Sequence, residues 1–282
     1  MFKRIISCII STIIVLSVTI GYDRTPACRI AVMEQVPAQL GAVLPRAASY
    51  ELALTSAEEG RSYDVKCFGK DGLAFRSYSM TTVEGQEDEP LHYSYTDYTY
   101  DEAGNCTDSA TCDKDGTVYN EIRRTYDEKN RVLRTETYSE GELTGYSESI
   151  YTEVTNGQSS AVTTLYDADG EVQQMIRTGM NTDGNILSSR LFEGDEVTAS
   201  TDNRYDSKGR LVQSLQYGQD GLTYETLIVY STDGRTQTSR STCEGATYAI
   251  EQRTFDENGD PLAVTQTDGD GYTIRVTYTR FS

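Results

Sequence analysis

Three stretches of the chain place two acidic residues beside a glycine in the order Asp-x-Asp-Gly, starting at Asp113, Asp167 and Asp268. Closely spaced carboxylates are ligands that Ca²⁺ prefers, so these stretches are the first candidates for chemistry. A calcium loop of the EF-hand type needs ligands at positions 1, 3 and 5 and glycine at position 6. Here glycine follows the second aspartate directly, and the same residues are those of a tight turn. We predict turns and no metal site, with weak calcium binding as the alternative.

Residues for nucleophilic or acid–base catalysis are difficult to assemble. His92 is the only histidine, and no Ser/His/Asp or Cys/His set can be built around it. The sequence has no P-loop, no GxGxxG after a strand and no GxSxG. Carboxylates occur in almost every predicted turn, so proximity in sequence marks no pair as a general acid and base. We expect no catalytic residue and no cofactor; the alternative is a carbohydrate-active enzyme with an acidic pair on one sheet face.

The charge balance limits the partners. Among 282 residues, 44 are acidic and 25 are basic, which gives a net charge of −19. Nucleic acids and anionic membrane surfaces are therefore poor partners, because binding them needs clustered Lys and Arg. Hydrophobic residues make up 37% of the chain, with 21 Tyr and no Trp. This composition suits a sheet with one wet face better than a deep aliphatic core.

The N-terminal segment has the layout of a secretory signal peptide. Lys3 and Arg4 precede the uncharged, mostly apolar run 5–21. We predict a signal peptide over 1–21, or over 1–27 if cleavage falls before Cys28, and therefore a secreted or cell-surface protein. Contact with a membrane is expected only through this segment, if it stays uncleaved. Residues 22–62 are expected to form a linker or a cap.

Export exposes cysteines to an oxidising compartment, where disulfides form. Beyond Cys8 the chain has five cysteines, an odd number, so at least one stays without an intramolecular partner. Cys106 and Cys112 would lie about 20 Å apart in an extended strand. A disulfide needs Cα atoms within about 7 Å, so these two can pair only if the segment bends sharply.

Turn signals recur at a fixed spacing along 63–282. Four-residue turns start at residues 181, 206, 231 and 256, each 25 residues after the last, and a second series of turns lies between them. The runs between turns are short and rich in Leu, Val, Thr and Tyr, which favour strands. In the run 272–280, apolar and polar residues alternate as a half-buried strand requires. A fixed period of this length indicates a repeat architecture.

These elements predict an all-β fold. Connections this short make successive strands antiparallel neighbours, so we expect a long antiparallel meander of two-strand repeats of about 25 residues. The two turn series should lie on opposite edges of the sheet. A sheet of many strands twists, and we expect this one to curl.

The stretch Tyr205-Asp-Ser-Lys-Gly-Arg-Leu211 resembles the YD (tyrosine–aspartate) repeat of bacterial Rhs and wall-associated proteins, with its pattern YD-x-x-G-R-L. Its repeat-defining residues and those of the weaker copies are Tyr100, Asp101, Gly104, Tyr126, Asp127, Tyr166, Asp167, Gly170, Tyr205, Asp206, Gly209, Phe255, Asp256 and Gly259. The resemblance implies a curling β-sheet protein acting at cell surfaces or in toxin delivery. MORN-variant repeats look similar, since they also place DG turns between short strands.

The recurring aromatic residues are expected to form a ladder on one sheet face, packing against cross-strand neighbours; binding of sugars is the alternative. Together these features favour a non-enzymatic, exported binding or structural module. Its partner would be a polysaccharide or a surface protein. A carbohydrate-active enzyme and a remnant or partner of an Rhs-type toxin system are the alternatives.

Overall fold

The fold consists of antiparallel strands. The computed structural model describes residues 49–57, 60–82, 92–154, 158–271 and 273–281. These residues form eighteen strands and no helix. The strands are β1 (Ser49–Ala57), β2 (Gly60–Phe68), β3 (Ala74–Thr82), β4 (His92–Tyr100), β5 (Cys106–Asp113), β6 (Val118–Tyr126), β7 (Val132–Ser139), β8 (Glu142–Val154), β9 (Gln158–Asp167), β10 (Val172–Met180), β11 (Ile186–Glu193), β12 (Glu196–Tyr205), β13 (Leu211–Gly218), β14 (Gly221–Tyr230), β15 (Thr236–Cys243), β16 (Ala246–Phe255), β17 (Pro261–Asp268) and β18 (Thr273–Phe281).

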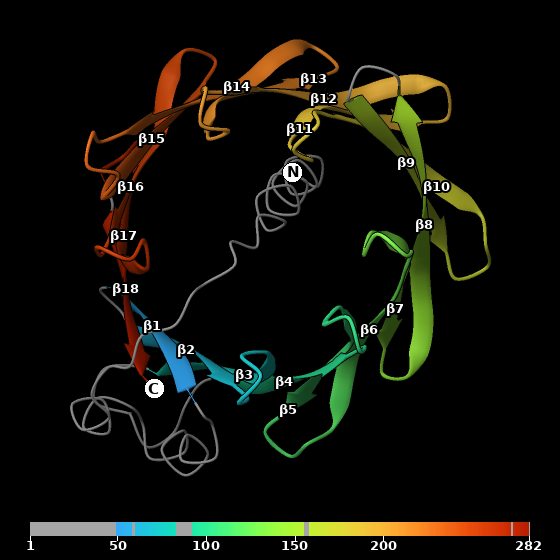
Figure 1. The fold of residues 1–282 in the computed structure, drawn as a ribbon, viewed down its shortest axis with the longest axis horizontal. Helices are drawn as coiled ribbons and strands as arrows, with labels where there is room; N and C mark the ends of the chain where they lie inside the picture. Colours follow the sequence, from blue (N-terminus) through green and yellow to red (C-terminus); the bar gives the residue numbers. More distant parts are fainter. Residues whose placement is uncertain (1–48, 58–59, 83–91, 155–157, 272, 282) are drawn as a thin grey trace.

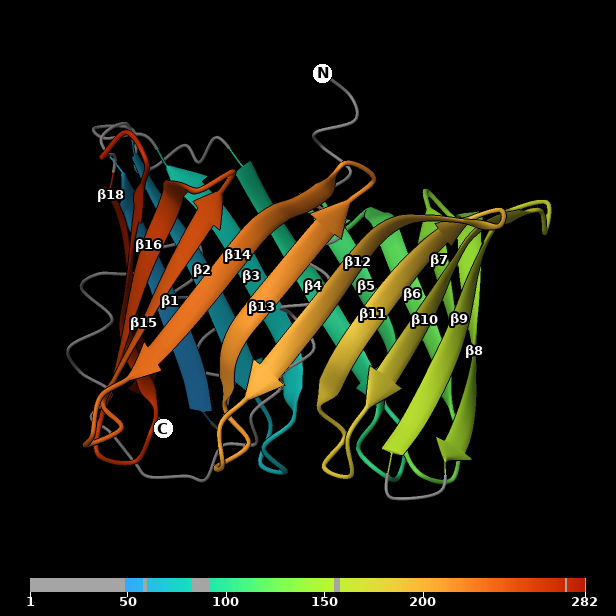
Figure 2. The ribbon, with the colours of Figure 1, turned by 90° about the horizontal axis from the view of Figure 1, so that it is seen from above.

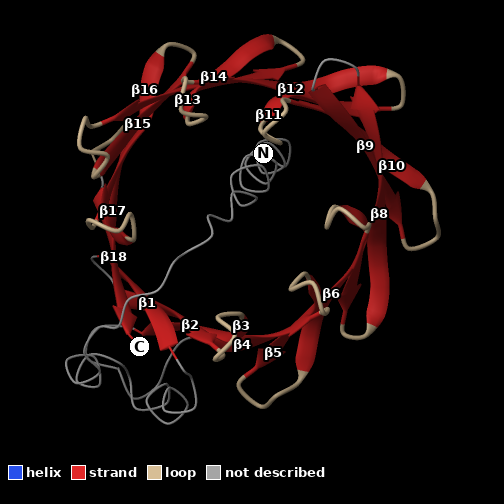
Figure 3. Cartoon of the chain, in the orientation of Figure 1, coloured by secondary structure: helices blue, strands red, loops and turns tan. Residues whose placement is uncertain are grey.

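The sheet closes on itself. Every strand pairs antiparallel with the next, and β1 also pairs with β18, so that Leu52 lies opposite Val65 on one side and Thr279 on the other. Viewed along its axis, the described strands form a ring (Figures 1 and 3). The expectation of an all-β antiparallel meander is confirmed, and its curl is complete.

The sheet begins earlier in the chain than the sequence suggested. Residues 22–62 were expected to be a linker or cap, yet β1 and the start of β2 lie within this range. The boundary expected at residue 63 is therefore corrected to Ser49. The physical reason is that β1 and β18 pair with each other. Without this pairing, each of the two strands would have an unpaired edge. The expected signal peptide lies outside the described residues.

The turns fall into two sets at the two ends of the cylinder (Figure 2). Turns after even-numbered strands gather at one end, and turns after odd-numbered strands gather at the other. We call the first end the YD rim, because Tyr126, Asp127, Tyr205 and Asp206 lie there. Left-handed glycines recur in both sets, and Asn130 adopts the same conformation, at φ 60°, in the place that glycine takes in the other turns.

Strand alternation creates an inner and an outer face. The register aligns Ser94, Ser109, Ala161, Ser189, Thr201 and Ala249 on one face, and all six are small and buried. The other face carries the most exposed apolar side chains, Ile150 at 70% and Val229 at 67%. Curvature crowds side chains on the concave side and spreads them on the convex side. The face lined with Ser, Thr and Ala is therefore the inner face.

The most deeply buried apolar cluster lies on the outer face of β1–β3. Val65, Cys67 and Met80 are at most 1% exposed, and Leu52 and Tyr78 lie beside them. Because these residues come from adjacent strands, the cluster fixes the register around the closure between β1 and β18.

The cysteines that the structure describes are free. Cys106 and Cys112 both belong to β5, which is extended, so the sharp bend that a disulfide between them would need does not occur. Cys67 and Cys112 are buried on the outer face, and Cys106 and Cys243 are partly exposed.

Candidate functional site

The aspartate of the YD pattern organises the backbone of its own turn. Oδ1 of Asp206 accepts hydrogen bonds from the backbone N–H groups of Lys208 and Arg210, both at 2.9 Å. Gly209 has φ 75°, the left-handed region that other residues adopt at a cost, and its N–H donates to the carbonyl of Asp206. The carboxylate therefore replaces the backbone partners that a tight turn leaves unsatisfied.

The arginine and tyrosine of the pattern link one turn to the next pair of strands. Arg210 donates from Nε to Oδ2 of Asp206 at 2.8 Å. Its guanidinium carbon lies 4.1 Å from the ring centre of Tyr230, in the next even strand. Tyr230 in turn donates its hydroxyl to the carbonyl of Leu211 at 3.0 Å. All three side chains are thus occupied within the fold.

The same geometry occurs elsewhere on the YD rim. Arg131 donates to Asp127 and lies 4.4 Å from the ring centre of Tyr151. Tyr151 donates its hydroxyl to the carbonyl of Val132. Tyr126 and Tyr205 make the equivalent hydroxyl bonds to the carbonyls of the residues 20 and 19 positions earlier.

Two further predicted copies share this rim. Asp101 accepts backbone hydrogen bonds from its own turn, after Tyr100, and Asn105 takes the place of the arginine. Asp256 does the same before Gly259, and Phe255 stands in the tyrosine position without a hydroxyl. The predicted residues of strands β4, β6, β12 and β16 therefore lie at the same end of the cylinder, at separate places around it.

The predicted copy at Tyr166 lies elsewhere. Tyr166 ends an odd-numbered strand, so Asp167 and Gly170 belong to the opposite end of the cylinder. The Tyr166 ring is on the outer face and stacks on Tyr146 with ring centres 4.6 Å apart. Asp167 still organises its turn as Asp206 does, because that chemistry is local. The tyrosine differs because its face depends on the strand.

The pKa values follow from these contacts. Burial raises the pKa of Tyr100 to about 12, and burial also raises the pKa values of Tyr126, Tyr205 and Tyr230. The backbone N–H of Arg210, followed by its side chain, lowers the pKa of Asp206. The tyrosines are therefore held neutral and the turn aspartates are held ionised, which suits structural roles.

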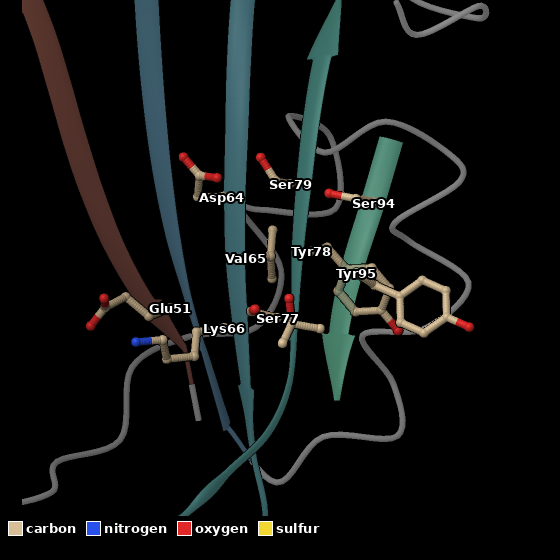
Figure 4. Close-up of a pocket in the computed structure, with 10 residues that line it drawn as sticks. Glu51, Asp64, Val65, Lys66, Ser77, Tyr78, Ser79, Ser94 and Tyr95 are labelled. Carbon is tan, nitrogen blue, oxygen red and sulfur yellow. The ribbon is translucent and has the colours of Figure 1, made fainter. Parts of the chain in front are cut away.

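A hollow on the inner face of β1–β4 is the better candidate for binding. Its volume is about 270 Å³, and its lining residues are drawn in Figure 4. They are Glu51, Asp64, Val65, Lys66, Ser77, Tyr78, Ser79, Ser94, Tyr95 and Thr96. Four strands each contribute polar side chains, and Asp64, Val65 and Lys66 are consecutive in β2.

Pairing arranges the polar side chains of the hollow in two rows. Asp64, Ser79 and Ser94 lie opposite one another across β2, β3 and β4. Glu51, Lys66, Ser77 and Thr96 form the neighbouring row across β1–β4. The second row spans about 14 Å, and the rows are about 7 Å apart.

Several groups in the hollow have no partner. Among the residues that the structure describes, the Asp64 carboxylate, the Lys66 ammonium and the Ser79 hydroxyl form no hydrogen bond or ion pair, and both charged residues are exposed. In contrast, Ser77 bonds to the Tyr98 hydroxyl at 2.8 Å, and Thr96 bonds to Thr111 at 3.0 Å. The free groups are a cation, an anion and a hydroxyl.

Sequence reasoning did not single out Asp64, Lys66 or Ser79. The available signal was the alternation Tyr-Asp-Val-Lys-Cys over residues 63–67, in which apolar and charged residues exchange faces. That alternation predicts a strand, but the neighbours of its polar face are set by the register with β3 and β4.

No group of three or more His, Cys, Asp or Glu side chains within the described ranges is arranged to hold a metal ion. In the same part of the chain, no helix has the length and apolar character to cross a membrane.

Comparisons with known proteins give weak structural similarities. No family model matches the sequence, and no curated protein matches it. A porin-like protein from Bacteroides uniformis is 12% identical with a TM-score of 0.45; the match covers 83% of this chain and 97% of that one. The Photorhabdus luminescens Tc holotoxin pore is 11% identical with a TM-score of 0.17. That match covers 79% of this chain and 20% of the toxin chain.

A third similar structure is a DUF1329 family protein from Desulfovibrio piger, at 13% identity and a TM-score of 0.21. The match covers 83% of this chain and 84% of that one. At these identities and TM-scores the similarities assign neither a family nor a function.

Proposed function

We propose that this protein is an exported, non-catalytic repeat module of the YD type that binds a ligand on the inner face of its cylinder. The observation that carries the proposal is that some polar residues are engaged within the fold and others are left available for a ligand. The repeated Asp, Gly, Arg and Tyr residues are engaged in turns and strand contacts, as at Asp206, Arg210 and Tyr230. Groups that have no partner among the described residues lie instead in the hollow on β1–β4.

The closed sheet supports a binding role. Paired strands leave no backbone edge to recruit another strand, so recognition falls to side chains. The inner wall displays hydroxyls at regular spacing, some of which already pair with each other, as Ser149 does with Thr163 and Thr226 with Ser241. A wall of this kind offers many hydrogen-bonding groups.

The experiment uses the full chain purified from the compartment to which it is exported. Immobilised protein is tested for retention of surface polysaccharides on a glycan array and of surface proteins in a pull-down. Retention without turnover is expected, and Ser79→Trp, which fills the hollow, should weaken retention of a ligand whose charged groups lie there. Hydrolysis of the retained ligand that disappears on replacing one carboxylate would contradict the proposal.

Export is part of the same proposal and has its own test. Mass spectrometry of the mature N-terminus should find a chain that starts at Tyr22 or Cys28. A chain that retains Met1 inside the cell would contradict export. A connection with a toxin system stays a prediction, which the neighbouring genes would test.

One observation favours a second candidate, a carbohydrate-active enzyme. Glu51 and Asp64 line the same hollow as diagonal neighbours, about 7 to 8 Å apart. Two carboxylates on neighbouring positions of one sheet face are the residue types that glycosidases use. However, a general acid needs an apolar enclosure that keeps it protonated, and Asp64 is exposed beside Lys66. Turnover of a glycan that is lost in both Glu51→Gln and Asp64→Asn would favour this candidate over the first.

A further inference from the structure

We propose that the hollow on β1–β4 binds a small zwitterion, a ligand with an ammonium and a carboxylate separated as they are in a dipeptide. This inference rests on the proposed binding function and adds the chemical class of ligand. Asp64 would receive the ammonium, Lys66 would receive the carboxylate, and Ser79 would bond to the ammonium beside Asp64.

Geometry supports this class of ligand. Asp64 and Lys66 lie two residues apart on β2 and point to the same face, so their Cα atoms are about 7 Å apart. Two extended residues span about 7 Å, so the termini of a dipeptide match this separation. The volume of about 270 Å³ leaves room for a ligand of this size.

Charge also supports it. The chain carries a net charge of −19, so an isolated Lys on a wet inner wall would ordinarily find a carboxylate. Lys66 faces Glu51 across the β1–β2 pair, yet Glu51 has another interaction and Lys66 has none among the described residues. Asp64 likewise has no partner among the described residues. A zwitterion would satisfy both charges at once without changing the net charge of the wall.

The surroundings disfavour a neutral sugar in this hollow. Sugars are usually held by an aromatic ring against one face as well as by hydrogen bonds. Tyr78 and Tyr95 belong to the lining of the hollow, but the register places their rings on the outer face, where Tyr78 is 2% exposed. Neither ring is presented to the cylinder interior as a platform.

The test is binding of glycylglycine to the full-length chain, followed by ligand-observed NMR at millimolar concentrations. Two further probes remove one charge each: N-acetyl-glycylglycine lacks the ammonium, and glycylglycine amide lacks the carboxylate. Glycylglycine should bind, and each blocked probe should bind about tenfold more weakly, because each loses a charge-assisted hydrogen bond.

Two variants assign the charges. Asp64→Asn should remove the preference for glycylglycine over the acetylated probe and keep the preference over the amide. Lys66→Met, which retains an unbranched stem, should do the reverse. Asp195→Asn is the matched control, because it removes the same charge at an exposed turn beside β12, away from the hollow. It should leave all three affinities unchanged.

The outcomes separate this inference from the proposed function. Equal binding of the three probes, no binding at all, or equal weakening in Asp64→Asn and Asp195→Asn would overturn the zwitterion site. If a glycan or surface protein is still retained, the binding function stands without it. Cleavage of glycylglycine that depends on Glu51 or Asp64 would instead overturn the non-catalytic function.

Discussion

The turn at Asp206 and the hollow around Asp64 use the same residue type for opposite purposes. Asp206 accepts two backbone hydrogen bonds and one from Arg210, so its oxygens are occupied. Asp64 lies on an open inner wall, and no described residue binds it. The difference shows that the role of an aspartate in this chain depends on its hydrogen-bond partners. The aspartates of the repeated turns are the ones that have such partners.

The arginine and lysine repeat this contrast. Arg210 lies against a tyrosine ring and a carboxylate, which is the role its planar guanidinium suits. Lys66 presents a single charge to the interior of the cylinder. If this distinction is correct, substitutions on the YD rim should change stability, and substitutions in the hollow should change binding.

The largest stability effect is expected at Tyr205. Its ring is half-buried and its hydroxyl donates to the carbonyl of Ile186 at 2.9 Å. Tyr205→Ala should lower the free energy of unfolding by about 2 to 3 kcal/mol, and Tyr205→Phe by about 1 kcal/mol. Urea unfolding measures both, with Lys66→Ala as the hollow control. If Lys66→Ala lowered the free energy of unfolding as much as Tyr205→Ala does, the distinction between a structural rim and a binding hollow would be wrong.

A smaller effect is expected from backbone conformation. Gly209 has φ 75° and no atom crowds the position of a Cβ, so the cost of Gly209→Ala comes from φ alone. It should destabilise the protein by about 1 kcal/mol. Asn130 occupies the equivalent place at φ 60°, and its Oδ1 accepts an exposed hydrogen bond from Nδ2 of Asn105 at 3.0 Å. Glycine relieves the left-handed strain and loses only this exposed bond, so Asn130→Gly should be neutral or slightly stabilising. The thermal unfolding temperature should fall for Gly209→Ala and should stay the same or rise for Asn130→Gly. A lower unfolding temperature for Asn130→Gly would contradict this account of the turn.

Acid should weaken the turns of the YD rim. The pKa values of Asp101, Asp127, Asp206 and Asp256 are lowered in the folded protein, each by hydrogen bonds to its carboxylate. Their stabilisation is therefore present above the unfolded value of about 3.8 and is lost as the pH falls through the folded values. The urea midpoint should fall below about pH 4, and Asp206→Asn should make that fall shallower. An unchanged slope in this variant would remove Asp206 from the explanation.

Local chemistry explains which features the sequence reveals. The turn at Asp206 and Gly209 depends on four consecutive residues, so its type follows from the residues themselves. The local pattern does not tell at which end of the cylinder Tyr166 lies, because a Tyr-Asp pair can end a strand that runs in either direction. Only the parity of the strand puts the Tyr205 ring on the inner face and the Tyr166 ring on the outer face.

Long-range pairing explains what the sequence does not reveal. Strand β1 follows Pro45 and reads as part of a linker, and its role depends on pairing with β18 at the other end of the chain. The hollow depends on the register between β2 and β3, which brings Asp64 beside Ser79. Neither pairing can be predicted from a short stretch of the sequence.

The most direct test of the central claim compares Asp206→Ala with Asp64→Ala, which remove the same side chain and the same charge. Urea unfolding of both variants measures stability, and glycylglycine titration measures binding. Asp206→Ala should lower the unfolding midpoint and leave the affinity unchanged, whereas Asp64→Ala should leave the midpoint unchanged and weaken binding about tenfold. Equal midpoints for the two variants, or a lower midpoint for Asp64→Ala, would contradict the assignment of repeated aspartates to structure and of Asp64 to binding.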